Sequence, residues 1–142
     1  MTLKVYDPDQ YTLVVCGITP HGYADGSFIT VKMKTPMFQS TVGTDGEVSR
    51  ARSNDRRADI ELKLMQTSDS NDLFSALAAI EQNRQNGAGV GAFLLKDRNG
   101  RTELSAAECW LVQEPDIDLD RTPKERVWKF EVAKLQRFDG GV

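Results

Sequence analysis

The sequence predicts a mainly β protein with one α-helix, in which the helix lies on an antiparallel β-sandwich or small barrel. Three observations support this fold class. Several segments are rich in β-branched and aromatic residues or alternate apolar with polar residues, one segment has the spacing of an amphipathic helix, and short turn-forming clusters separate them. The length of 142 residues matches a single core, so we expect one domain over residues 1–142.

The first two predicted strands lie in the N-terminal quarter of the chain. Residues 11–18 (YTLVVCGI) form an apolar run that closes at the turn-forming residues 19–22. Residues 27–33 (SFITVKM) are rich in β-branched and aromatic side chains and follow a second turn at residues 24–26. We expect these two strands to pair with each other as a hairpin.

Alternation marks the next predicted strand, at residues 59–65. Its apolar members Ile60, Leu62 and Leu64 alternate with Glu61, Lys63 and Met65. This is the pattern of a half-buried strand. Further along, residues 92–96 and 103–112 flank Asn99-Gly100, the strongest short hairpin signal in the sequence. Residues 127–138 form the last predicted strand.

One segment has convincing helical spacing. Its apolar positions are Leu73, Phe74, Leu77, Ala78 and Ile80. They follow the i, i+4, i+7 pattern of an amphipathic helix. Ser68 or Ser70 can cap its start, Asp72 suits the positive end of the helix dipole, and Gly87 stands where a helix stops. We therefore expect a helix at about residues 70–86.

Composition restricts the class of protein. The chain is 39% apolar and 27% charged, with a net charge of -3 and a pI near 5.2. An acidic chain is a poor partner for nucleic acid phosphates, so DNA binding as the main function is disfavoured. No apolar run reaches about 18 residues, and the N-terminus lacks a basic stretch followed by an apolar one. We expect no membrane partner and no cleaved secretion signal.

The residues that usually carry catalysis have no supporting neighbours. His21, the only histidine, lies in a Pro-His-Gly turn, and one imidazole cannot build the usual zinc or triad geometry. Cys16 and Cys109 lie in apolar runs without the cationic flanks that lower a thiol pKa. We expect two free buried thiols, with a disulfide between them as the less favoured alternative. No catalytic residue is assigned, and we expect no enzyme.

Two further patterns resemble ligand loops only superficially. Residues 87–91 (GAGVG) have the glycines of a nucleotide loop, but that loop needs a strand before it and a helix after it, and here the order is reversed. Residues 116–120 (DIDLD) echo a calcium loop, yet Arg121 and Val127 stand where glycine and glutamate are required. We expect no cofactor and no metal, and we interpret residues 116–120 as a solvated connector.

The most informative segment is a charged arm at about residues 43–59. It begins with the turn Thr44-Asp45-Gly46 and has almost nothing to bury afterwards. One interpretation is a solvated loop with local ion pairs, each worth about 0–1 kcal/mol. The other is that its charges pair with acidic patches on an adjacent copy, where repetition by symmetry makes weak contacts selective. The candidate contact residues are Gly46, Arg50, Arg52, Ser53, Asn54, Asp55, Arg56 and Arg57.

The central third of the chain also carries motifs in a specific order. They are Asp45-Gly46-Glu47, then Ser53-Asn54-Asp55, then Leu64-x-Gln66-Thr67-Ser68-x-Ser70-Asn71-Asp72. In this order they resemble tail tube proteins of contractile-tailed, myovirus-type bacteriophages. The flanking strands agree in pattern and length. Type VI secretion tube proteins and the tubes of long non-contractile phages are similar in general architecture.

The resemblance implies one tail-tube-like domain that oligomerises into a ring with an inner β-barrel. Six copies would close each ring, rings would stack into a tube, and the arm would reach the neighbouring subunit or the next ring. Residues 68–72 would be the start of the helix, a structural role. The presence of both Arg56 and Arg57 departs from the family's pattern and leaves the ion-pair partners of the arm open.

The resemblance also implies a function in the virion tail, after assembly in the host cytoplasm. Double-stranded DNA would pass through the tube on ejection without specific binding, and an acidic or neutral wall would avoid phosphate contacts. Glu61 and Lys63 are candidates for the lumen wall, because such a sheet has one face on water and the other on the core. The expected partners are further copies of the chain, the tail sheath protein, the baseplate or initiator, and the tape measure protein.

Two alternatives remain open. The chain could be another tube component, such as a type VI secretion tube-like protein or a tail terminator, whose ring would not stack. It could also be a soluble ligand-binding or enzymatic β-domain, for which a deep pocket with convergent polar groups is expected. We rank the second alternative well behind.

Overall fold

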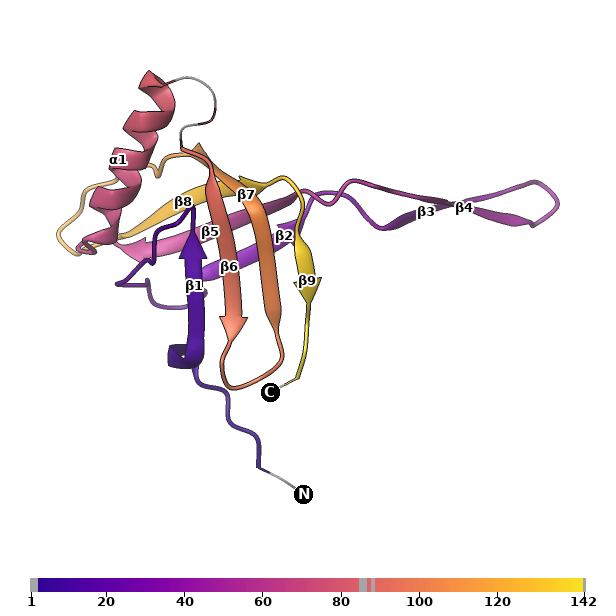
Figure 1. Cartoon of the computed structure of the whole chain (residues 1–142), viewed down its shortest axis with the longest axis horizontal. Coiled ribbons are helices and arrows are strands. Elements are labelled where there is room, and N and C mark those ends of the chain that lie inside the picture. Colours follow the sequence, from indigo (N-terminus) through magenta and orange to yellow (C-terminus); the bar gives the residue numbers. More distant parts are fainter. Residues whose placement is uncertain (1–2, 85–86, 88, 142) are drawn as a thin grey trace.

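The computed structural model describes residues 3–84, 87 and 89–141. It shows a strongly curled antiparallel sheet that forms a half-barrel, one helix packed on it, and a long two-stranded hairpin that projects from the body (Figure 1). The predicted fold class, mainly β with one α-helix, is confirmed. Among the described residues, no helix has both the length and the apolar character needed to cross a membrane.

Within the described residues, the strands divide into a large curled sheet and the separate hairpin. The order of the large sheet is β1-β6-β7-β8-β5-β2, with β9 paired to β7, and β3 and β4 form the hairpin. A short 3₁₀ turn, η1, precedes β1. The elements are η1 Pro8–Gln10, β1 Tyr11–Val15, β2 Ile29–Met33, β3 Phe38–Val42, β4 Val48–Arg52, β5 Ala58–Met65, α1 Ser70–Asn83, β6 Gly91–Asp97, β7 Glu103–Gln113, β8 Glu125–Val132 and β9 Gln136–Phe138.

The predicted hairpin between the first two strands is wrong. β1 pairs with β6 and β2 pairs with β5, at opposite ends of the sheet order. The reason lies in the connection between them. Val15 and Ile18 exchange backbone hydrogen bonds of 2.8 and 2.9 Å, which closes a tight turn and pairs Ile18 with the last residue of β1. Farther along, Ala24 N–H donates to the Lys63 carbonyl at 3.0 Å, so the connection continues along β5 and not along β1.

The C-terminal half of the sheet follows the sequence more closely. The hairpin around Asn99-Gly100 is confirmed, with β6 and β7 as its strands. The predicted last strand is split into β8 and β9, because the chain bends at Leu135, which is buried and whose N–H donates to the Arg56 carbonyl at 3.0 Å. After the bend, β9 pairs with the first part of β7, whereas β8 pairs with its last part.

The core lies on the concave side of the curled sheet, and α1 covers it. Phe74 packs its ring against Phe130 and Trp128, with centroids 5.3 and 5.6 Å apart. Burying an aromatic side chain of this size stabilises the fold by about 1.5–3 kcal/mol. The other large core side chains come from β1, β5, β6, β7 and β8 and include Val15, Ile60, Leu62, Leu64, Phe93 and Val132.

The helix differs from its prediction in two details. It begins at Ser70 as expected but ends at Asn83, because Arg84 already has an extended backbone. Of the remainder of the expected helix, residues 85–86 lie outside the described residues. Leu73, expected on the buried face, is 52% exposed, because the helix turns Phe74 and Leu77 toward the core instead.

Candidate assembly interface

The hairpin β3–β4 stands away from the body, and every residue of its two strands is exposed (Figure 1). Its tip is a tight turn in which Gly43 N–H donates to the Glu47 carbonyl at 2.8 Å and Asp45 accepts from Glu47 N–H. Gly46 has a φ of +88°, a conformation that side chains rarely adopt, which explains the glycine at this position. A two-stranded hairpin without a covering layer is marginally stable in water, so this element needs further contacts.

The projecting element does not have the bounds predicted for the arm. The prediction started at residue 43 and missed β3, because Phe38–Val42 lacks the alternation of a half-buried strand. It ended at residue 59, whereas Ala58 and Asp59 already belong to β5 in the body. Residues 34–37 and 53–57 lie between the body and the hairpin and form its base.

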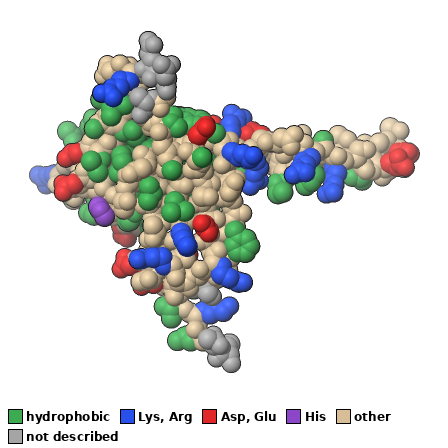
Figure 2. Space-filling view, viewed as in Figure 1, with side chains coloured by type: hydrophobic (Ala, Val, Ile, Leu, Met, Phe, Trp, Pro, Cys, Tyr) green, Lys and Arg blue, Asp and Glu red, His purple; other side chains and the backbone are tan. Residues whose placement is uncertain are grey.

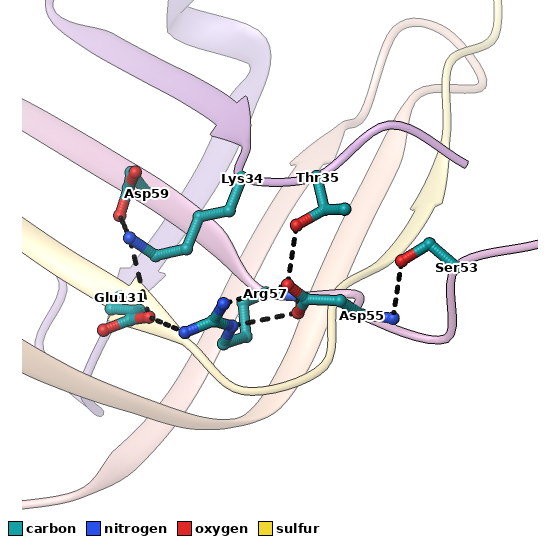
Figure 3. Close-up of polar contacts among 7 residues, drawn as sticks. All are labelled: Lys34, Thr35, Ser53, Asp55, Arg57, Asp59 and Glu131. Carbon is teal, nitrogen blue, oxygen red and sulfur yellow. Dashed lines mark hydrogen bonds and ion pairs between the residues drawn. The ribbon is translucent and has the colours of Figure 1, made fainter. Parts of the chain in front are cut away.

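Four charged side chains join the base of the hairpin to the sheet (Figure 3). Lys34 Nζ lies 2.8 Å from Asp59 and 3.7 Å from Glu131. The Arg57 guanidinium lies 3.8 Å from the same Glu131 carboxylate. Two cations from the base therefore lie beside one anion of β8 and connect the base of the hairpin to the sheet.

Asp55 is the centre of the hydrogen bonds within the base. Arg57 donates to it through Nε and Nη2, both at 2.9 Å, and the Thr35 hydroxyl donates at 2.7 Å. The Arg57 guanidinium, and then the Thr35 hydroxyl, hold the pKa of Asp55 well below its usual range. Asp55 N–H in turn donates to the Ser53 hydroxyl at 3.2 Å. We call Lys34, Thr35, Ser53, Asp55, Arg57, Asp59 and Glu131 the base cluster.

The predicted arm residues thus have different structural positions. Ser53, Asp55 and Arg57 belong to the base cluster, and the Arg56 guanidinium donates to the Leu135 carbonyl at 3.4 Å. Asn54 is exposed beside them. Gly46 forms the tip turn, while Arg50 and Arg52 lie on β4. Among the predicted cations, then, these two are the ones that the hairpin presents beyond its base.

The two faces of the hairpin differ in chemistry. The register pairs Phe38 with Arg52, Ser40 with Arg50, and Val42 with Val48, so these side chains share one face. The Arg50 guanidinium lies 4.4 Å from the centre of the Phe38 ring, a cation–π contact. We call Phe38, Val42, Val48, Arg50 and Arg52 the apolar-basic face.

Only uncharged, mostly polar residues occupy the opposite face. They are Gln39, Thr41, Ser49 and Ala51. Val42 and Val48 on the apolar-basic face are 67% and 66% exposed. Figure 2 shows apolar and basic side chains along one side of the hairpin and acidic side chains at its tip. An exposed patch of this kind typically marks a protein interaction site.

A second exposed segment connects β7 to β8 and lies beside α1, at the opposite end of the molecule from the hairpin (Figure 1). Ile117 and Leu119 in it are 78% and 73% exposed. Asp118 and Asp120 approach Lys124 Nζ at 2.9 and 3.8 Å. We call residues 114–120 (EPDIDLD) the acidic-apolar segment. The sequence analysis interpreted residues 116–120 as a solvated connector. The feature that could have indicated an interaction surface was the alternation of carboxylates with Ile117 and Leu119.

Glu61 and Lys63, predicted for the lumen wall, lie on the face of β5 that points away from the core. The register places Glu61 between Thr30 and Lys129 and Lys63 opposite Val127, so this outer face mixes acidic, basic and uncharged groups. Both side chains are half-buried. Within the described residues, no three His, Cys, Asp or Glu side chains form a group that could hold a metal ion.

Comparison with known proteins gives consistent matches. Residues 17–140 match the family model described as the bacteriophage PhiTE tail tube protein. The structural protein ORF10 of Pseudomonas phage KPP10 is 26% identical over 144 residues, which cover 97% of this chain and 83% of that protein. The cryo-EM structure of the anti-feeding prophage cap, a tube terminating cap, shares the fold with a TM-score of 0.58 at 9% identity, covering 97% of this chain and 93% of that chain.

Proposed function

The chain belongs to the phage tail tube family described by the bacteriophage PhiTE tail tube protein and is a structural component of a phage tail, and from this premise we propose that it forms hexameric rings that stack into the inner tube of a contractile tail. The observation that carries the proposal is the projecting hairpin with its exposed apolar-basic face. A monomer gains nothing from such an element, whereas a repeated subunit gains one contact per copy.

Ring closure would also cover the unpaired edges of the large sheet. β1 and β2 are the ends of the strand order in the large sheet, so each has one side without a partner among the described strands. Exposed edges invite uncontrolled pairing, and closing sheets from several subunits into one barrel removes them. We propose that neighbouring subunits cover these edges and that the single domain of residues 1–142 is the repeating unit.

The outer face of β5 and its neighbours suits a conduit for DNA. It carries acidic and basic side chains together, with Glu61 opposite Lys129 and Lys63 on the same face of β5, and the whole chain is acidic. A uniformly basic wall would bind phosphates and release counterions, which would hold DNA in place. We propose that this face lines the lumen and lets double-stranded DNA pass on ejection. The sheath, the baseplate or initiator, and the tape measure protein are the proposed tail partners.

Electron microscopy of the concentrated, purified protein tests the proposal. Hollow tubes with six-fold end views are the expected result. Rings that do not stack would favour the second candidate, a tail terminator; the resemblance to a tube terminating cap concerns the fold alone. A monomer at every concentration, also in the presence of preformed baseplates, would contradict a tube subunit and make a ligand screen the next experiment.

A further inference from the structure

The apolar-basic face of the hairpin has no partner within its own chain. Phe38, Val42 and Val48 are exposed on it, and the hairpin projects away from the body (Figure 1). The face carries two arginines, Arg50 and Arg52, whose guanidinium groups make no ion pair among the described residues. Its complement must therefore offer carboxylates together with apolar side chains.

The acidic-apolar segment offers this combination. Ile117 and Leu119 are among the most exposed large apolar side chains of the described chain. Lys124 draws Asp118 and Asp120 toward the body, so Glu114 and Asp116 are the carboxylates of the segment that do not contact Lys124. Carboxylates and apolar groups are thus presented side by side, as arginines and apolar groups are on the hairpin.

The outer face of β5 and β8, a second charged surface of the body, is a weaker complement to the apolar-basic face. On the outer face of β5 and β8, carboxylates already have cationic neighbours: Asp59 and Glu131 pair with Lys34, and Glu61 lies opposite Lys129. Docking arginines there would require the breaking of existing pairs. The acidic-apolar segment has four carboxylates in seven residues, and among the described residues Lys124 is the one cation that forms ion pairs with them.

The two surfaces lie at opposite ends of the molecule (Figure 1). The two surfaces of one copy therefore cannot contact each other. Because the surfaces are unlike, the contact does not require a two-fold dimer. A contact between unlike surfaces repeats head to tail, which generates a ring when the rotation closes. Complementary charge then sets the direction and the partner, while the apolar side chains are removed from water.

We propose that the apolar-basic face of one copy docks on the acidic-apolar segment of the next copy. This inference rests on the proposed ring assembly and names the contact that closes it. Phe38, Val42 and Val48 pack against Ile117 and Leu119 of the neighbour. The arginines of the hairpin pair with Glu114 and Asp116, the carboxylates of the segment that do not contact Lys124.

Two charge-reversed variants test the contact. The hairpin variant is Arg50→Glu with Arg52→Glu, and the segment variant is Glu114→Arg with Asp116→Arg. Each places like charges in the contact, so each alone is expected to raise the protein concentration required for assembly by about tenfold or more. Circular dichroism and the unfolding midpoint of each monomer establish that the fold is intact.

Mixing the two variants gives the decisive result. In an equimolar mixture, the acidic hairpin of one variant meets the basic segment of the other, and the two wild-type surfaces meet at the next contact. An alternating ring with an even number of subunits is then fully complementary. We expect assembly at near the wild-type concentration, measured by sedimentation and electron microscopy. Restoration by mixing requires a contact between copies.

The outcomes separate this inference from the proposed function. If the wild type forms tubes and both variants do so equally well, the contact is wrong and the function stands. If both variants fail and their mixture also fails while both monomers fold, the pairing of these two surfaces is overturned. If the wild type forms no oligomer under any condition, ring assembly and the contact fall together.

Discussion

Asn71 accepts a hydrogen bond from the indole N–H of Trp128 at 2.9 Å. Its own amide group donates to the carbonyls of Met65 at 2.9 Å and Ser68 at 3.1 Å. One side chain therefore joins the end of β5, the start of α1 and the middle of β8. This explains the asparagine of the Ser-Asn-Asp motif in the first turn of the helix as a structural connection that holds α1 on the core.

Replacing Asn71 by alanine is expected to lower the free energy of unfolding by about 1–3 kcal/mol, because it leaves the Trp128 N–H without its acceptor. Urea unfolding followed by tryptophan fluorescence measures the change. The matched control is Asn54→Ala in the other Ser-Asn-Asp motif, residues 53–55, where the asparagine is exposed and a change within about 0.5 kcal/mol is expected. Equal losses in both variants would contradict the connecting role of Asn71.

A carboxylate and a guanidinium hold the base of the hairpin, and their contact predicts a pH dependence. Arg57 and Thr35 lower the pKa of Asp55 in the folded state. A lowered pKa means that the ionised form stabilises the fold, fully above the unfolded value of about 4, and that this stabilisation is lost as the pH falls toward the folded value. Asp55→Asn should therefore unfold at a lower temperature than the wild type at neutral pH.

The difference between Asp55→Asn and the wild type should shrink once the pH falls below about 4. Calorimetry of both proteins at matched pH values measures it. Taking the difference matters, because Lys124 also lowers the pKa of Asp118, and that carboxyl titrates in both proteins. A gap between the two unfolding temperatures that stays constant from neutral pH to about pH 2.5 would exclude the Asp55–Arg57 contact as its cause.

The sequence predicted those parts of the fold that depend on neighbours along the chain. Alternation in 59–65, the Asn99-Gly100 turn and the start of α1 at Ser70 are all local signals, and the structure confirms them. The pairing of β1 with β6 is not local. It depends on the turn after Val15 and on the curl of the whole sheet, so the nearest strand along the chain was the wrong partner.

The hairpin shows why the site was only partly predictable. The turn around Gly46 was recognised, but β3 and β4 bury nothing within the chain and therefore lack the periodicity that reveals a strand. Leu73 is the converse case, because it fits the helical spacing and is nevertheless exposed on α1. Exposed strands and exposed apolar side chains are not constrained by the chain's own core, so core-facing periodicity does not reveal them.

The two faces of the hairpin should respond differently to substitution. Changing Val42 and Val48 to serine removes apolar groups that are exposed in the monomer, so the unfolding midpoint should change little. Assembly should weaken strongly if this face is covered in the tube, because buried apolar area drives association. The control is Thr41→Ala with Ser49→Ala on the opposite face. Sedimentation of both variants measures assembly, and equal behaviour of the two faces would contradict a one-sided contact.

We expect the buried Cys109 thiol to react slowly with thiol reagents. The neighbouring Cys16 thiol and burial both raise the pKa of Cys109, and Cys16 donates to the Cys109 carbonyl at 3.2 Å. Little thiolate is then available in the folded state. In a Cys16→Ser variant, Cys109 should react with a thiol reagent only as fast as the protein unfolds. Labelling at the rate of a free thiol in native buffer would show that the strand opens locally.

The hairpin should be removable without loss of the body. Ser53 N–H donates to the Met37 carbonyl at 2.8 Å across the base of the hairpin. A hydrogen bond of the same kind, from the last N–H to the first carbonyl, closes a four-residue turn. An Asn-Gly pair inserted between Met37 and Ser53 in place of residues 38–52 fits this spacing as a type I′ turn. The base cluster stays intact, since its members lie outside the excised residues.

We expect the excised protein to keep the circular dichroism and unfolding midpoint of a folded monomer, because the removed strands bury nothing in the body. It should lose the ability to form tubes at any concentration at which the wild type assembles. A matched control replaces only Gln39 and Ala51 on the polar face by serine and keeps the hairpin. Tubes formed by the excised protein would place the assembly contacts on the sheet edges alone, whereas a protein that no longer folds would make the hairpin part of the domain's own stability.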